Sequence, residues 1–155
     1  MEHIKNQYRH LFTADARIVI GEGWFWLLSG LCHALDQYSG GTYLSEPVTI
    51  TRVCHSLGTL AVEHHGGDST TEKIIGAVQL ASCQICQICA GREEVGGTFG
   101  PAIYTICRKC WILDEKFHMH FLSPHVYSAI AIQKIEAGIL VLPDSWFKRH
   151  LQILV

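Results

Sequence analysis

The sequence predicts an α+β fold, in which a small antiparallel sheet packs with helices and a four-cysteine zinc ribbon or knuckle is attached. Three observations carry this prediction: apolar residues at helical spacing over 24–38, a β-hairpin pattern over 47–65, and two C-x-x-C pairs. The length of 155 residues fits one domain with an appendage. We expect an α+β body over 1–82, a zinc-binding module over 83–110, and an α/β extension over 111–155 packed on the same domain.

Composition and charge narrow the classes of partner. The chain is 48% hydrophobic and 17% charged, so it can bury a sizeable core and still offer apolar surface to another protein. The net charge of −2 gives no basic footprint, and the local basic clusters are 108–109 and 148–150, so a nucleic acid partner is possible but not favoured. The chain has no apolar run of roughly 18 residues and begins with a polar segment, so we expect neither a membrane partner nor a secretory signal.

The first predicted helix spans residues 24–38 and follows a short apolar run, 18–20, that fits a small strand. One face of this helix is apolar and consists of Trp24, Leu27, Leu28, Leu31, Leu35 and Tyr38. Phe25 and Trp26 lie off this stripe, and two interpretations are open for them. They either make a second contact with the body of the domain or form an aromatic patch that binds a partner.

A β-hairpin and a second helix follow the first helix. β-branched residues on both sides of a turn at 56–58 predict the hairpin. The motif Ser69-x-x-Glu72 predicts a capping box at the start of a helix that ends near residue 82. A helix stripe and a strand pair each need an apolar partner, so we expect the two to form one core. The expected contacts join Trp24, Leu28, Leu31 and Leu35 to Val53, Leu60 and Val62.

The cysteines give the most specific chemical signal. The pairs Cys86/Cys89 and Cys107/Cys110 are separated by 17 residues, which fits a four-thiolate zinc site. A turn of two residues lets both sulfurs of a pair face one ion, and Gly91 stands where such a turn often needs a positive φ. Cys83-x-x-Cys86 is also a C-x-x-C, so Cys83 is an alternative ligand. We favour Cys86 and Cys89, because the preceding helix extends through Cys83.

Buried thiols and disulfides are the alternatives to zinc at these cysteines. Disulfides need an oxidising compartment, for which the sequence offers no secretory signal. A closed set of four thiolates leaves no open position for a water molecule or a substrate, so the predicted zinc is structural and no catalytic residue is expected. An enzyme is less favoured than an interaction protein or a nucleic-acid-binding module, because no H-E-x-x-H, G-x-S-x-G or P-loop motif is present. His64 and His65 lie near two further candidate metal ligands, His55 and Glu63. Adjacent residues of a strand face opposite sides, however, so His64 and His65 cannot bind the same ion there.

The extension over 111–155 is rich in aromatic residues: Trp111, Phe117, Phe121, Tyr127, Trp146 and Phe147. Large aromatic side chains dominate binding energy at protein interfaces, so this segment is a candidate for target recognition. The alternative is that these residues complete the core. Trp146 and Phe147 are adjacent on an expected short helix and point in different directions, so we favour one of them as a partner-binding residue.

The order of elements resembles a group of small tailed-phage and prophage proteins with a Gly-Trp helix, a Val-rich hairpin and two C-x-x-C pairs. Roughly residues 10–110 are covered. The hairpin lacks the Lys and Glu charges that the group usually carries before Gly58. The residues that carry the resemblance are Leu11-Phe12-Thr13, Gly21-Glu22-Gly23-Trp24, Leu31-Cys32, Val53, Gly58-Thr59-Leu60, Gly67-Asp68, Ile74-Ile75, Ser82, Cys86, Cys89, Gly91, Thr105, Cys107 and Cys110.

The resemblance implies a phage origin, a zinc-bearing α+β fold and a place in the cytoplasm of an infected bacterial host. It implies no catalytic residue. We expect an interaction protein that binds and inhibits a host protein complex, of which a CRISPR effector or another antiviral defence system is the best-known class. The alternatives are a nucleic-acid-binding zinc-ribbon regulator and, less favoured, a metal-dependent enzyme.

Overall fold

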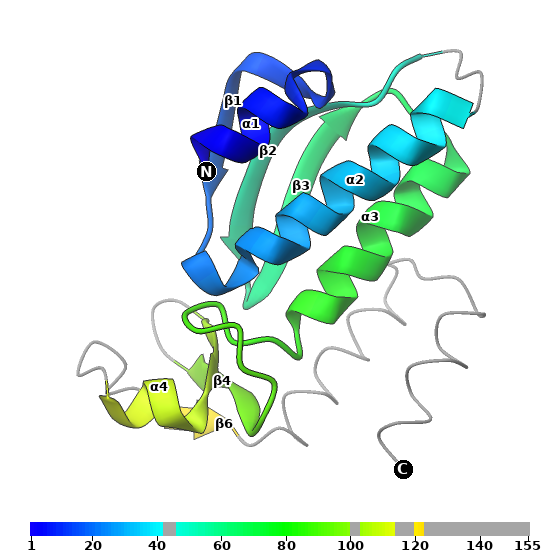
Figure 1. Cartoon of the computed structure of the whole chain (residues 1–155). Coiled ribbons are helices and arrows are strands. Elements are labelled where there is room, and N and C mark those ends of the chain that lie inside the picture. The colour runs from blue at the N-terminus through cyan, green and yellow to red at the C-terminus, as the bar shows by residue number, and fades with distance from the viewer. Residues whose placement is uncertain (42–45, 100–102, 114–119, 123–155) are drawn as a thin grey trace.

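The computed structural model of the protein describes residues 1–41, 46–99, 103–113 and 120–122. These residues form helices and two small sheets, which confirms the α+β class. In Figure 1, helices α2 and α3 lie side by side over one face of the first sheet, and the second sheet lies at one end of this body. The predicted extension beyond residue 122 lies outside the described residues.

The first sheet has the strand order β1-β2-β3. Strands β2 (Thr49–Ser56) and β3 (Thr59–His65) form the predicted antiparallel hairpin. Their connection is a two-residue turn in which Leu57 and Gly58 have φ angles of 49° and 78°, as a tight hairpin of the type I′ kind requires. Strand β1 (Phe12–Val19) pairs parallel to β2, so the sheet is mixed rather than antiparallel throughout.

Strand β1 is longer than the run of three apolar residues that the sequence suggested. Its Ile18 is in register with Val53 and packs against the core, whereas the neighbouring Arg17 is in register with Arg52 and is exposed. Polar residues on the exposed side alternate with the apolar ones, so a run of consecutive apolar residues marks only the end of the strand. A short helix that the sequence did not predict, α1 (Glu2–Gln7), precedes it, followed by a 3-10 turn, η1 (Arg9–Leu11).

The first long helix, α2 (Phe25–Gly41), follows the 3-10 turn η2 (Glu22–Trp24). The predicted core is confirmed. Trp24 and three leucines of the helix stripe are fully buried in one cluster with Val53 and Leu60, and a partly buried Val62 packs against it. The three leucines are Leu28, Leu31 and Leu35.

Helix α3 (Ser69–Ser82) has the predicted bounds, but its capping box begins one residue earlier than predicted. Asp68 is the N-cap, and its carboxylate accepts hydrogen bonds from the backbone N–H groups of Thr70 and Thr71 at 2.9 and 3.0 Å. The Thr71 hydroxyl in turn accepts from the Asp68 N–H. Asp68 therefore holds the cap position that the sequence assigned to Ser69.

The second sheet has the strand order β5-β4-β6. Strand β4 (Val95–Phe99) pairs antiparallel with β5 (Thr105–Cys107) on one side and with β6 (His120–Leu122) on the other. Helix α4 (Arg108–Leu113) follows β5 directly. This sheet contacts the body at the β2–β3 turn, where the Thr105 hydroxyl donates to the Gly58 carbonyl and Tyr104 stacks on His55.

Candidate metal centre

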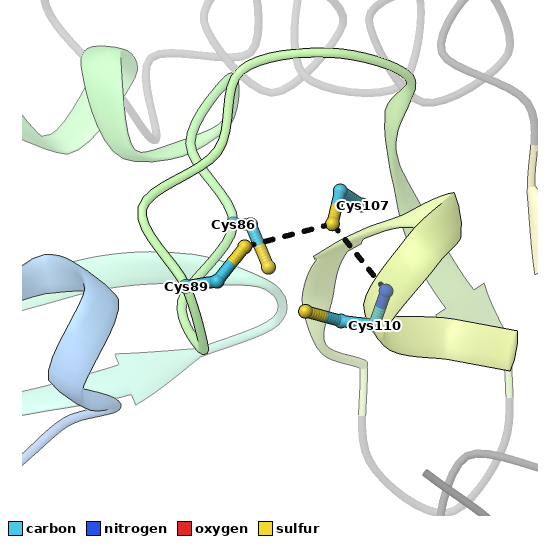
Figure 2. A group of neighbouring side chains, drawn as sticks. All are labelled: Cys86, Cys89, Cys107 and Cys110. Atoms are coloured by element: carbon cyan, nitrogen blue, oxygen red, sulfur yellow. Dashed lines mark hydrogen bonds between the residues drawn. The ribbon is translucent and has the colours of Figure 1, made fainter. Parts of the chain in front are cut away.

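Four cysteine sulfurs converge between the end of α3 and the second sheet. The Sγ atoms of Cys86, Cys89, Cys107 and Cys110 all lie within 4.8 Å of one another, and none is in a disulfide. The first pair lies in the loop after α3, Cys107 ends β5, and Cys110 lies on α4. Figure 2 shows the four side chains pointing toward a common point from these two segments.

The spacing of the sulfurs fits a tetrahedral thiolate centre. With metal–sulfur distances of about 2.3 Å, a tetrahedron places neighbouring sulfurs about 3.8 Å apart. The Sγ atoms of Cys89 and Cys107 are 3.7 Å apart. That separation is too long for a disulfide, whose S–S bond is about 2.05 Å. The four side chains therefore lie close enough together to bind one metal ion.

The turn of the first pair is closed by two backbone hydrogen bonds. The N–H of Cys86 donates to the carbonyl of Gly91 at 2.8 Å, and the N–H of Ala90 donates to the carbonyl of Cys86 at 2.9 Å. The residue with positive φ is Ala90, at 62°, so the prediction that Gly91 supplies it is wrong. Gly91 is small for another reason, since a Cβ there would lie 3.2 Å from the Cys89 sulfur.

Backbone N–H groups point at the sulfurs of both pairs. The N–H of Gly91 donates to the Cys89 sulfur at 3.4 Å, and the N–H of Cys110 donates to the Cys107 sulfur at 3.4 Å. Figure 2 shows the second of these bonds at the start of α4. A donor directed at sulfur stabilises the thiolate, which is the form that binds a metal.

The protonation of the four thiols depends on burial and on these donors. Burial raises the pKa of Cys86 and Cys110, and the neighbouring thiols raise that of Cys110 further. Burial also acts to raise the pKa of Cys89, but the Gly91 N–H and the other thiols outweigh it and lower that pKa. Four thiolates close together repel one another without a cation, so a divalent ion would stabilise the deprotonated cluster.

Cys83, the alternative ligand, does not join the cluster. It caps the C-terminus of α3, is buried, and directs its sulfur to the Gln79 carbonyl at 3.7 Å. The structure therefore assembles the pair that the sequence favoured. Cys32, buried in α2, is also outside the cluster, and burial raises its pKa to about 12.

The candidate partner-binding residues fall in different places. Trp26 has 44% of its surface exposed, and the guanidinium of Arg92 lies 5.3 Å from the centre of its ring. Phe25 is half-buried. Trp146 and Phe147 lie outside the described residues, so their role stays a prediction.

The polar residues of the hairpin do not form a second metal site. His64 contacts Glu72 at 3.3 Å, whereas the Glu63 carboxylate accepts a hydrogen bond from Arg52 at 3.3 Å. Within the described residues, the four cysteines are the one group of three or more potential ligands close enough together to hold a metal.

Comparisons with protein-family models, curated proteins and solved structures found no match to this chain. The resemblance to small phage proteins therefore stays a prediction. In the part of the chain that the structure describes, no helix has both the length and the apolar character needed to cross a bilayer.

Proposed function

We propose that the chain is a zinc-stabilised interaction protein whose partner is a host protein complex of antiviral defence, such as a CRISPR effector. The partner class follows from the resemblance of residues 10–110 to phage proteins. The observation that carries the interaction role is the combination of a closed four-thiolate centre with an exposed Trp26 beside it.

The donor set supports zinc as the metal. Soft thiolate ligands in a tetrahedron are typical of zinc or iron–sulfur sites, and a single ion with four protein thiolates has no position left for a substrate. A zinc ion in a centre of this kind contributes to folding. We therefore place the function on the surface of the protein.

The surface beside the centre supports protein binding. Trp26 and Arg92 belong to residue types that are enriched at binding hot spots, and here the cation lies over the aromatic ring. Ile88 lies between the first two cysteines, on the turn that precedes Arg92. It has 42% of its surface exposed and adds an apolar side chain to this region. We define these three residues, Trp26, Ile88 and Arg92, as the knuckle surface.

The test is an affinity pull-down from a bacterial lysate, read by mass spectrometry, with wild-type protein beside Trp26→Ala and Gln37→Ala variants. Gln37 is the control, because it is exposed and lies on the same helix about three turns after Trp26. We expect wild type and Gln37→Ala to capture the same defence complex and Trp26→Ala to capture much less of it.

Two outcomes contradict the proposal. Equal capture by all three proteins would exclude the knuckle surface as the recognition site. Capture of DNA or RNA in place of a protein, lost as salt is raised, would favour the nucleic-acid-binding alternative through Arg108 and Lys109.

A further inference from the structure

A turn far from the cysteines in sequence lies directly against the first cysteine pair. Gly21 and Gly23 flank Glu22 at the start of η2, more than sixty positions before Cys86. A Cβ on Gly21 would lie closer than 3.0 Å to the Gln87 carbonyl oxygen. A Cβ on Gly23 would also lie closer than 3.0 Å to the Cys86 carbonyl oxygen and to the Ala90 nitrogen. Only glycine leaves room for the two backbones to meet in this way.

Gly23 lies against the two atoms of one of the hydrogen bonds that close the cysteine turn. The Ala90 N–H donates to the Cys86 carbonyl at 2.9 Å, and that bond sets the separation of Cys86 and Cys89. A side chain at position 23 would push against this bond, so either the cysteine turn or the docked Gly21–Trp24 turn would have to shift.

Two hydrogen bonds join the same turn to the carbonyl groups of the cysteine loop. The N–H of Gly23 donates to the Gln87 carbonyl at 2.9 Å, and the indole N–H of Trp24 donates to the buried Ile85 carbonyl at 2.8 Å. The N–H of Gln87 is also bonded, to the Thr105 carbonyl of β5 at 2.9 Å. These bonds orient the peptide groups on both sides of Cys86 and tie them to β5, which ends at Cys107.

We infer that the Gly21–Trp24 turn is the outer support of the metal centre, and that Gly23 and Trp24 are positioning residues for metal binding. This inference rests on the zinc site of the proposed function. Outer partners that fix the orientation of metal ligands typically change metal affinity by about 10- to 100-fold when they are removed. The turn leads directly into α2, which carries Trp26, whereas Arg92 follows the cysteine loop. On this inference, the metal also fixes the position of Trp26 relative to Ile88 and Arg92 in the knuckle surface.

Metal binding and docking of the turn are linked equilibria. If zinc strengthens the docking of the Gly21–Trp24 turn on the cysteine loop by a given factor, then loss of the docking must lower the affinity for zinc by the same factor. A residue with a merely structural role in α2 would change the melting temperature but not the affinity for zinc.

The experiment measures zinc affinity by competition with a chromogenic chelator for wild type, Gly23→Ala and Gly30→Ala, in the full chain. Gly30 is the matched control, because it lies on α2 with nothing within 4 Å of an added Cβ. We expect Gly23→Ala to bind zinc about 10- to 100-fold more weakly. Gly30→Ala should stay within about twofold of wild type, as surface changes usually do. Cobalt substitution adds an absorption spectrum that should shift in Gly23→Ala and not in Gly30→Ala.

Three results would overturn the inference. A folded Gly23→Ala protein that binds zinc like wild type would show that the turn does not support the centre. An equal loss of affinity in Gly30→Ala would show that any change in α2 has the same effect. A wild-type chain that binds no zinc would remove both the proposed zinc site and this inference, so the two failures are distinguishable.

Hydrogen exchange on the wild-type chain decides the question if Gly23→Ala does not fold. Chelation should speed exchange in a peptide covering 21–26, where the Gly23 N–H loses its acceptor, and leave strand β2 protected. Unchanged exchange in 21–26 after metal removal would contradict the inference. Equal exposure of both segments would also contradict it, because the metal would then hold the whole chain and not this turn.

Discussion

Replacing Trp24 by Phe tests the contact between the body and the cysteine loop at its most buried point. Trp24 is fully buried, and its indole N–H donates to a carbonyl of Ile85, which is only 4% exposed. Phe keeps an aromatic ring but removes this donor, which leaves a buried carbonyl unpaired at a cost of about 1–3 kcal/mol. The ring is also smaller by roughly 40 Å³, and at about 24 cal/mol per Å³ the cavity adds about 1 kcal/mol. The expected loss is about 2–4 kcal/mol of the roughly 5–15 kcal/mol that stabilises a domain.

Urea denaturation followed by far-UV circular dichroism, with zinc in excess, measures this loss. Trp26→Phe is the matched control, since this neighbouring residue is 44% exposed and loses only part of its contact with Arg92. We expect the control to cost less than about 1 kcal/mol. Equal losses in the two variants would refute the reasoning, because the buried hydrogen bond would then contribute nothing that an exposed ring does not.

Three further predictions concern the centre, the core and the helix cap. Cys89→Ser should abolish binding of one equivalent of zinc in elemental analysis, whereas Cys83→Ser should retain it, because only Cys89 belongs to the cluster. Leu31→Ala should lower the free energy of unfolding by about 2–5 kcal/mol, since Leu31 is fully buried. The control Leu113→Ala should lower it by less than about 0.5 kcal/mol, because Leu113 is exposed. Similar losses in the two variants would show that Leu31 is outside the core. The hydrogen bond from Tyr38, with those from Thr71 and Thr70, lowers the pKa of Asp68 below its ordinary 3.8. The cap should therefore stabilise the fold fully at a pH above the ordinary pKa and progressively less as the pH falls through the lowered pKa. Asp68→Ala should remove this pH dependence in a melting series and Ser69→Ala should leave it intact; the reverse result would restore Ser69 as the cap.

The sequence was sufficient for the parts of the structure that depend on local spacing. Two residues between cysteines fix how the sulfurs of one pair can meet, so the four ligands could be named in advance. The leucine stripe of α2 repeats at the helical period, and it therefore identified the buried face correctly. The choice between Cys83 and Cys89 was also local, because it depended on where α3 ends.

Features that depend on competition or on distant contacts could not be predicted in this way. Asp68 and Ser69 are both good caps, and the sequence does not reveal which one the backbone will place at the helix start. The positive φ of Ala90 in place of Gly91 arises from the geometry that the Cys86 carbonyl imposes on the turn. The docking of Gly23 on the cysteine loop joins segments far apart in the chain, and its sole local trace is the pair of glycines around Glu22.

The parallel pairing of β1 with β2 imposes an order of assembly on the chain. The β2–β3 hairpin closes across a two-residue turn, so it can form from local contacts within roughly microseconds. Strand β1 reaches its partner only after the intervening segment, which contains α2, has crossed from the end of one strand to the start of the other. Closing that longer loop costs more entropy and is slower. During synthesis the first strand to be made therefore stays unpaired at least until Thr49–Ser56 has left the ribosome.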